Sequence, residues 1–377
     1  MGKSSFFIFF HAMKAWNGRI FNRNFIVYLF LPLLTICTAC ANNIGSNSSV
    51  QSEFVLGTFC SIDLFERKDT ALYRRLFDRL AELEMIFSAN REDSELAKIN
   101  RNAGLEPVEI SQELFTVLER SLYFAEATEG LFDPTVGPLV KLWGIGTENE
   151  RIPAKNEIEA ALSLINYREV ELIRANNEAL SSKYGTAFLK RTGMALDLGA
   201  IAKGYAADAL VSILKEAGIE KALIDLGGNL YVWGKKGDGE YWNIAVQDPL
   251  SARGSYAGIL NLEGSVSVVS SGVYERFFVG DNGKKYHHIL DLSGNGGEPG
   301  YPVESSILST TVIAASSMDA DVLSTSCFIL GYDKGLALAQ KSSAEIIYIE
   351  ENASGEIIVR GSPGAMAVFI QADMTVP

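Results

Sequence analysis

Apolar and polar positions follow two periodicities along the chain, one typical of helices and one typical of strands. Leucines and a phenylalanine recur every three or four residues across residues 69–87, which predicts a helix with one buried face. Ser111 is a favourable N-cap for a second helix, which is expected to end near Thr128, just before Gly130. Further helices are predicted at residues 155–164, 199–217 and 317–330.

Short segments rich in apolar and β-branched residues predict many strands. Residues 54–65 alternate and are expected to form one strand, and glycine and proline predict surface loops at 134–138 and 293–304. Other strands are expected at residues 170–172, 188–189, 194–198, 222–226, 230–233, 242–246, 258–262, 266–270, 273–279, 286–291, 307–314, 344–349 and 356–360. Because helices and strands are mixed without a strict βαβ rhythm, we expect an α+β fold with mixed or antiparallel sheets flanked by helices.

The first forty residues predict an export signal. An apolar run of 12 residues at 25–36 follows Arg19 and Arg23, and it falls short of the ~20 residues that a membrane-spanning helix needs. Small residues then lead to Cys40, in a pattern that resembles a bacterial lipoprotein cleavage site with Cys40 as the lipidated residue. A plain signal peptide cut nearby and an uncleaved anchor are the alternatives.

The chain is therefore expected to have three parts. Residues 1–40 form the signal, residues 41–52 form a flexible tether rich in asparagine and serine, and residues 53–370 form one folded domain. A lipid on Cys40 would hold the protein at the periplasmic side of the inner membrane of a bacterial cell envelope.

The charge balance limits the possible partners. The net charge is −13, and residues 1–40 hold four basic residues and no acidic one, so the remainder is more acidic still. Such a surface repels phosphate backbones, and nucleic acid is not an expected partner. An anionic ligand would need a local lysine or a metal ion. The distant Cys60 and Cys327 lie in apolar surroundings and are expected to be buried free thiols.

Residues 197–208 carry the densest chemical signal. The segment reads Asp-Leu-Gly-Ala-Ile-Ala-Lys-Gly-Tyr-Ala-Ala-Asp at the predicted start of a helix. Backbone N–H groups there, together with Lys203, would form a phosphate cradle that Gly199 and Gly204 leave open to a ligand. A tight turn with a surface lysine is the plain structural alternative.

Asp321 and Thr325 form the second signal. They are four residues apart in a predicted helix, so they share one face. A carboxylate and a hydroxyl make a small oxygen site that suits Mg²⁺, which takes further ligands from water and phosphates. The alternative is helix capping by Asp319 or Ser317, with Thr325 bonded back into its own helix.

His287 and His288 form the third signal. Neighbours on a strand point to opposite faces, so one histidine can enter a site while the other faces away. A histidine near a carboxylate such as Asp291 is a usual pair for deprotonating a hydroxyl group. Surface or structural histidines are the alternative, and two histidines with two distant cysteines do not favour zinc.

Three loops rich in glycine add to these signals, at residues 130–139, 225–230 and 270–276. Each alone is explained by a turn, but together they suggest that several backbone segments converge on one flat ligand. In order with Leu56-Gly57-Thr58, Asp93 to Leu96 and the motifs above, they resemble the ApbE family, the FAD:protein FMN transferases of bacterial envelopes. The resemblance covers about residues 53–370.

The resemblance implies FAD as substrate, bound beside Mg²⁺ between two subdomains. The implied acceptor is a Thr or Ser hydroxyl of an exported protein, which receives FMN through a phosphoester bond, and His288 matches the catalytic histidine. The implied metal ligands are the Ala200 carbonyl, Asp321 and Thr325. The implied flavin-nucleotide contacts are Leu56, Asn90, Leu131, Phe132, Asp133, Asp197, Lys203 and Ile289.

The chain departs from the family pattern at three places. Leu56 stands where the family usually has Met, and Asn90 stands where many members have Tyr, so no ring is available there to stack on FAD. Residues 291–294 also differ, which affects the expected acceptor contacts. Two alternatives therefore stay open: an FAD pyrophosphatase that releases FMN and AMP, and a flavin-binding lipoprotein without catalysis.

Overall fold

The computed structural model describes residues 49–65, 67, 69–175, 184–236, 240–295 and 297–372. These residues belong to one compact unit that begins at Ser49. The predicted export signal, Cys40 and most of the tether lie outside the described residues. No helix within the described ranges is both long and apolar enough to cross a membrane.

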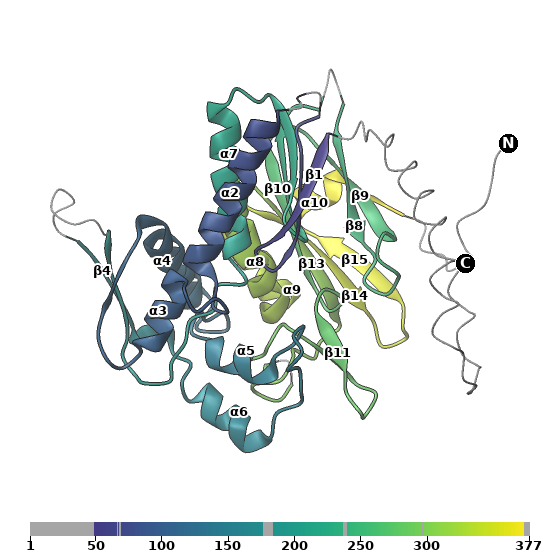
Figure 1. Cartoon of the computed structure of the whole chain (residues 1–377). Coiled ribbons are helices and arrows are strands. Elements are labelled where there is room, and N and C mark those ends of the chain that lie inside the picture. Colours follow the sequence, from purple (N-terminus) through teal and green to yellow (C-terminus); the bar gives the residue numbers. More distant parts are fainter. Residues whose placement is uncertain are drawn as a thin grey trace, which may run out of the picture. The chain divides into compact units, whose positions relative to one another are not determined.

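A central antiparallel sheet of eight strands organises this unit (Figure 1). Its strands, in spatial order, are β1 (Val50–Val55), β2 (Thr58–Asp63), β6 (Lys221–Asp225), β7 (Asn229–Gly234), β10 (Val266–Gly272), β13 (Ile307–Ala314), β14 (Glu345–Glu351) and β15 (Ile357–Gly361). Every neighbouring pair is antiparallel. Together with the flanking helices, this arrangement confirms the predicted α+β class.

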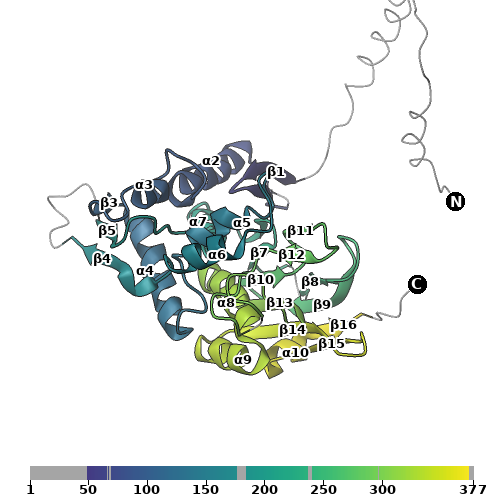
Figure 2. The same cartoon turned by 90° about the horizontal axis from the view of Figure 1, so that it is seen from below.

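Three smaller sheets surround the central one. Their strands are β8 (Trp242–Gln247), β9 (Tyr256–Leu262) and β16 (Phe369–Gln371); β3 (Val108–Ile110), β4 (Val170–Arg174) and β5 (Gly185–Leu189); and β11 (Phe277–Val279) and β12 (Lys285–His287). The β16-β9-β8 sheet encloses a second apolar cluster with the central sheet, including Trp242, Leu260 and Ile347. In Figures 1 and 2, α4 lies between the β3-β5-β4 sheet and α8.

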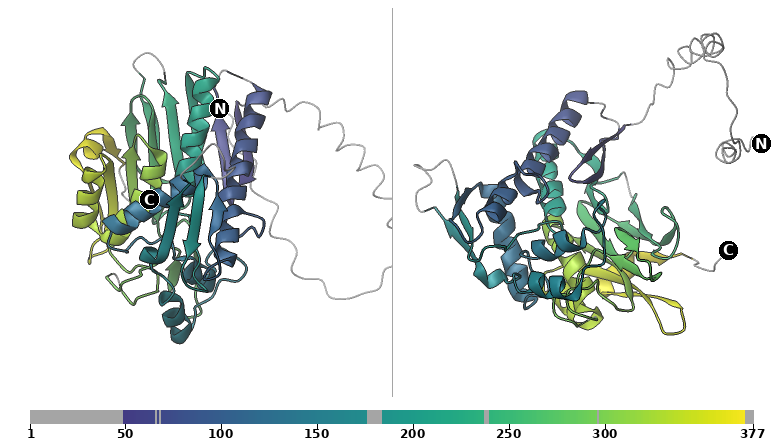
Figure 3. Two further views of the ribbon diagram at one scale, coloured as in Figure 1. Left: turned by 90° about the vertical axis from the view of Figure 1, so that its left-hand side faces the viewer. Right: turned by 60° about the horizontal axis from the view of Figure 1, so that its bottom comes forward.

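The helices at residues 70–87, 202–216, 317–330 and 332–341 cover the other face of the central sheet, whereas the helix at residues 363–368 packs in the second apolar cluster. The helices are α2 (Thr70–Phe87), α3 (Glu95–Arg101), α4 (Gln112–Ala127), α5 (Gly137–Trp143), α6 (Lys155–Leu162), the 3₁₀ turn η1 (Tyr167–Glu169), α7 (Ala202–Glu216), α8 (Ser317–Leu330), α9 (Tyr332–Lys341) and α10 (Pro363–Val368). Helices α2 and α7 run side by side (Figures 1 and 3). The predicted apolar stripe of α2 is buried in the main core, as shown by Leu76, Leu80 and Leu83.

The prediction of one strand over residues 54–65 is wrong, because the chain reverses at Leu56-Gly57. Leu56 has φ 56° and Gly57 has φ 68°, and two positive φ values are typical of a tight type I′ hairpin turn. Phe54 then pairs with Phe59 across the hairpin. Strand β1 begins at Val50, so the last residues assigned to the tether belong to the sheet.

Other differences also have local causes. The loop predicted near Pro138 holds α5, because proline in the first turn of a helix gives up no hydrogen bond. Residues 194–198 contain only an isolated bridge from Ala195 to Val136 rather than a strand, and α7 starts at Ala202 rather than at Gly199. The strand predicted at residues 286–291 ends at His287.

Helices α7 and α8 cross unusually closely at Gly204. A Cβ atom on Gly204 would lie 2.2 Å from the backbone oxygen of Ser317. One helical turn later, the Asp208 carboxylate accepts from the N–H groups of Ser317 at 2.9 Å and Met318 at 3.0 Å. Ser316 is the N-cap of α8, so the predicted capping by Asp319 or Ser317 is wrong.

Gly204→Ala should destabilise the protein by about 1–3 kcal/mol, because the added methyl group must push α7 away from α8. Chemical denaturation of both proteins measures this difference. Ser212→Ala, on the exposed part of the same helix, is the control and should change stability by less than about 0.5 kcal/mol. Equal stability of Gly204→Ala and the wild type would contradict the proposed packing constraint.

Candidate active site

The crossing of α7 and α8 brings together charged residues from two predicted motifs. Asp321 of α8 is 3% exposed, and its Oδ2 accepts a hydrogen bond from the Gly204 N–H at 2.9 Å. The Lys203 ammonium group lies 3.5 Å from Oδ1 of Asp321 and donates to the Gly199 carbonyl at 3.0 Å. A cation and a backbone donor therefore offset the cost of burying this carboxylate.

The carbonyl group of Ala200 is left free just before α7. In a regular helix, the Gly204 N–H would donate to the carbonyl four residues earlier, which is that of Ala200. That N–H donates to Asp321 instead, and among the described residues the Ala200 carbonyl has no hydrogen-bond partner. Thr325 lies one turn after Asp321 on the same face of α8. All three predicted metal ligands therefore belong to this helix crossing.

A chain of hydroxyl groups fixes the direction of the Thr325 proton. Ser324 Oγ donates to the Asp321 carbonyl at 2.8 Å. Because a hydroxyl has only one proton, Ser271 must be the donor in its 2.8 Å bond to Ser324. Thr325 must then donate in its 3.2 Å bond to Ser271. The lone pairs of Thr325 remain available to a cation, and the predicted bond from Thr325 back into its own helix is wrong.

Asp197 lies at the turn that leads into α7. Its Oδ1 accepts from the Gly199 N–H at 2.8 Å, and its own N–H donates to the Pro134 carbonyl at 2.9 Å. Burial raises the pKa of Asp197, although the Gly199 bond and the charges of Arg276 and Lys203 act to lower it. These contacts join the segment around residue 134 to the charged cluster.

The predicted phosphate cradle of open backbone donors is wrong at two positions. The N–H groups of Gly199 and Gly204 already donate to the carboxylates of Asp197 and Asp321. The missing side chain of Gly204 allows α8 to pack close to α7, and it does not open the backbone to a ligand. The group in this motif that still offers positive charge to an anion is the Lys203 ammonium.

The two neighbouring histidines occupy different surroundings, as the sequence predicted. His287 is buried, its Nε2 lies 2.9 Å from the Val303 carbonyl oxygen, and its ring meets that of Phe328 edge-to-face. His288 is half-buried, and its Nδ1 lies 3.3 Å from the Arg276 carbonyl oxygen. A carbonyl can only accept, so Nδ1 of His288 carries the proton and Nε2 has a free lone pair.

Burial also sets the charge state of both histidines. It lowers the pKa of each to about 4. For His288, the charges of His287, Arg276 and Lys203 act in the same direction. Both rings are therefore neutral near pH 7. Asp291, the predicted carboxylate partner, accepts instead from the N–H groups of Ser293 and Gly294, each at 2.9 Å, and organises its own turn.

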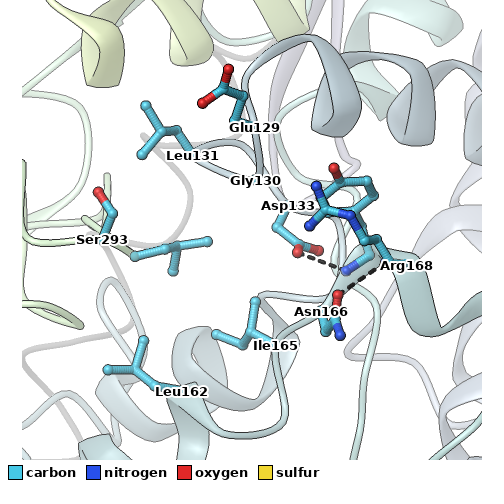
Figure 4. A pocket seen from close by; sticks show the side chains of 11 residues that line it. Glu129, Gly130, Leu131, Asp133, Leu162, Ile165, Asn166, Arg168 and Ser293 are labelled. Atoms are coloured by element: carbon cyan, nitrogen blue, oxygen red, sulfur yellow. Dashed lines mark hydrogen bonds between the residues drawn. The ribbon is translucent and has the colours of Figure 1, made fainter.

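The loop at residues 131–133 borders a pocket of about 270 Å³. Figure 4 shows that Leu131, Leu162 and Ile165 line it, with Ser293 on another segment. Asp133 also borders it, but its carboxylate accepts from Thr135 N–H at 2.8 Å, Thr135 Oγ at 2.6 Å and Tyr167 N–H at 2.8 Å. Asp133 therefore shapes the loop, and Phe132 is buried in the main core.

The remaining predicted contacts differ in position. Leu56 occupies the β1–β2 turn, and the neighbouring Gly57 carbonyl accepts from Arg276 at 3.4 Å. Ile289 is buried, and its carbonyl accepts from Val303 N–H at 2.9 Å. Asn90 lies on an exposed turn after α2, where its N–H donates to Ser88 Oγ at 3.2 Å. The turn at Leu56 therefore meets the segment that carries His288, whereas the bond of Asn90 is local.

The contacts of Ser271 and Arg276 were not predicted from the sequence. Both lie in the 270–276 loop that was expected to converge on a ligand. Their contacts with Thr325 and Gly57 span 54 and 219 positions in the sequence. No periodicity or short motif reports a contact at such a separation. Cys60 and Cys327 are buried and free, as predicted.

Comparison with known proteins identifies the family. A model of the ApbE family matches residues 56–349. This chain belongs to the ApbE family. The FAD:protein FMN transferase of Treponema pallidum (strain Nichols) is 38% identical over 323 residues, which cover 81% of this chain and 86% of that relative. The enzyme of the same name from Klebsiella pneumoniae (strain 342) is 36% identical, over 85% of this chain and 93% of the relative.

Solved structures of other ApbE proteins share this fold. The ApbE protein of Thermotoga maritima has a TM-score of 0.73 and 31% identity, and the match covers 85% of this chain and 98% of that one. The flavin transferase ApbE of Vibrio cholerae has a TM-score of 0.72 and 28% identity over the same shares. The α+β architecture is therefore that of the ApbE family.

The buried His287 should make the stability of this ApbE-family protein depend on pH. Its folded pKa of about 4 lies below the unfolded value near 6.5. When the pH falls from about 6.5 towards about 4, His287 binds a proton in the unfolded chain but not in the folded protein. The free energy of unfolding therefore decreases. Between pH 7 and pH 5 the loss from His287 should reach about 2 kcal/mol.

Urea denaturation at pH 7 and pH 5 tests this effect in the wild type and in His287→Gln. Glutamine retains a donor for the Val303 carbonyl but does not titrate, so the variant should lose less stability on acidification. The difference between the proteins cancels the contributions of buried carboxyl groups. The same pH dependence in both proteins would show that His287 is not responsible.

Proposed function

We propose that this protein is a Mg²⁺-dependent FAD:protein FMN transferase. It would cleave the diphosphate of FAD and join FMN through a phosphoester bond to a Thr or Ser hydroxyl of an exported acceptor protein. The observation that carries the proposal is the convergence of Lys203, Asp321 and Thr325 at the α7–α8 crossing. Relatives named FAD:protein FMN transferase support it.

The residues at the crossing fit a magnesium ion. Asp321 supplies one carboxylate, the Ala200 carbonyl has no partner among the described residues, and Thr325 uses its proton rather than its lone pairs in the bond to Ser271. Within the described ranges, no group of three or more His, Cys, Asp or Glu side chains is placed to hold a metal. A site with few protein oxygens suits Mg²⁺, which completes its coordination with water and substrate phosphates. When bound, the ion would polarise phosphoryl oxygens.

His288 would act as the general base. Nε2 accepts the proton of the attacking hydroxyl, while the Nδ1 bond to the Arg276 carbonyl holds the ring in place. The hydroxyl oxygen bonds to the phosphorus of the FMN half as the bond to the bridging oxygen breaks, and AMP leaves. Lys203 lies at the same helix crossing and supplies positive charge for the diphosphate in an otherwise acidic chain.

Hydrolysis of FAD to FMN and AMP is the second candidate. It needs the same bound diphosphate and differs only in the nucleophile, which is water. The exposed Asn90 supports this alternative, because it offers no aromatic ring to stack on FAD. Incubation with FAD, Mg²⁺ and a candidate exported acceptor decides between them: in-gel flavin fluorescence reports transfer, and free FMN without labelled protein reports hydrolysis alone.

His288→Ala should slow FMN transfer by roughly 10²- to 10⁴-fold, the usual contribution of a positioned base. FAD affinity should be retained, because His288 is not among the groups proposed to hold the diphosphate. His287→Ala is the control: it should transfer FMN at nearly the normal rate wherever it remains folded. An inactive but folded His287→Ala protein beside an active His288→Ala protein would reverse the assignment of the base.

The pH profile gives a second test of the same residue. Because burial lowers the pKa of His288 to about 4, the base is neutral well below pH 7. The kcat/KM for transfer, which reports the free enzyme, should therefore stay nearly flat from pH 7 to about pH 5. A fall centred near pH 6.5 would mean that the base has an ordinary histidine pKa.

Ser271→Ala should weaken Mg²⁺ binding by roughly 10- to 100-fold, because Thr325 loses the acceptor that orients its proton. Calorimetric titration of Mg²⁺ into FAD-bound protein, in a His288→Ala background that prevents turnover, measures the affinity. Ser270→Ala is the matched control, since its hydroxyl bonds to Thr311 at 2.8 Å rather than to Thr325. Equal Mg²⁺ affinity for the Ser271 and Ser270 variants would refute the role of Ser271.

We also propose that Cys40 carries a lipid that anchors the enzyme at the periplasmic side of the inner membrane. Cys40→Ser should move the protein to the soluble fraction, because each buried CH₂ of an acyl chain contributes about 0.8 kcal/mol to membrane binding. Cys37→Ser is the control and should remain in the membrane fraction. Retention of Cys40→Ser after a high-salt wash would instead support an uncleaved anchor.

A further inference from the structure

Arg276 joins three segments around His288. Its stem packs on the loop after α5, where Cδ lies 3.4 Å from the position that a Gly146 Cβ would occupy. Its guanidinium group donates to the Gly57 carbonyl in the β1–β2 turn at 3.4 Å. Its own carbonyl oxygen accepts from the His288 N–H at 3.1 Å and lies 3.3 Å from Nδ1 of that residue.

Arg276 forms no close ion pair, although its charge acts on Asp197 and Glu275. Arg120 and Arg360 form close ion pairs with Asp319 and Glu350. For Arg276, no carboxylate of the described part of the chain lies within 4.0 Å of the guanidinium group. A guanidinium has five N–H donors. The long bond to a neutral carbonyl engages one of them, so most of this fork is available to a ligand.

The same charge reaches the proposed reaction centre. Burial is the main cause of both pKa shifts: it raises the pKa of Asp197 and lowers that of His288. The charges of Arg276 and Lys203 each lower both pKa values. These two cations come from different segments and act on the same two residues. In a chain with a net charge of −13, an anionic ligand bound between these residues would meet both cations.

We propose that Arg276 binds the diphosphate of FAD, together with Lys203 and the metal ion. This inference rests on the proposed function. The diphosphate is anionic, and the planar fork of arginine matches two phosphate oxygens in a way that lysine cannot. Arg276 would also link the β1–β2 turn and the His288 segment at the same ligand, since its side chain contacts Gly57 and its main-chain carbonyl contacts His288.

The test compares flavins with and without phosphate. Flavin fluorescence quenching in EDTA, where no turnover occurs, gives the Kd of FAD and of riboflavin. Arg276→Gln should raise the Kd of FAD by roughly 10- to 100-fold, the range expected for hydrogen bonds to charged groups, and should leave riboflavin unchanged. Arg276→Lys retains the charge and should recover part of the loss.

Arg253→Gln is the matched control. Arg253 is also exposed, and its charge acts on Glu275 and Tyr274 of the same loop. Unlike Arg276, it is not among the charges that shift the pKa values of Asp197 and His288, so Arg253→Gln should change neither Kd, although it removes the same charge from the protein. The salt dependence of FAD binding should also weaken in Arg276→Gln but not in Arg253→Gln.

Two results would overturn the inference while leaving the proposed function intact. If Arg276→Gln weakens FAD and riboflavin equally, the side chain only holds the hairpin in place. If it weakens neither, the diphosphate lies elsewhere. A wild-type protein that binds no FAD would instead overturn the proposed function itself, and the inference with it.

Discussion

The candidate site depends on one hydrogen bond, from the Gly204 N–H to the Asp321 carboxylate. The bond forms only because a residue without a side chain lets α8 approach α7, and Asp208 then caps α8 one turn later. Its consequences extend in both directions. The Ala200 carbonyl loses its helical partner, and Thr325, one turn after Asp321 on α8, is brought to the same crossing. The spacing of the glycine, lysine and aspartate in this motif thus reflects helix packing as much as ligand binding.

Features that depend on residues within one or two helical turns could be predicted from the sequence, whereas features that depend on contacts between distant positions could not. The buried face of α2 and the Ser111 cap of α4 follow from residues within one or two turns, and both predictions are confirmed. The α5 helix was missed because Pro138 was taken as a breaker, although proline is tolerated in a first helical turn.

The same difference between local and distant contacts applies to the residues of the candidate site. Lys203, Asp321 and Thr325 could be singled out because they lie in short motifs with helical spacing. The hydroxyl chain through Ser271 and the position of Arg276 depend on strand and loop contacts that join distant parts of the chain. The backbone donors near Gly199 were predicted to face a ligand, because nothing in the sequence shows that carboxylates already occupy them.

The β1–β2 turn illustrates why a locally unfavourable residue can persist. A type I′ turn favours Asn-Gly, and a leucine with φ 56° is strained by on the order of 1 kcal/mol. Part of that cost is offset because Leu56 packs against the main core. The turn also presents the Gly57 carbonyl to Arg276, and Thr58 contacts the close turn at Gly227. Strain of this kind concentrates where geometry serves a site rather than stability, as expected of a turn that lies beside the residues proposed to bind the flavin nucleotide.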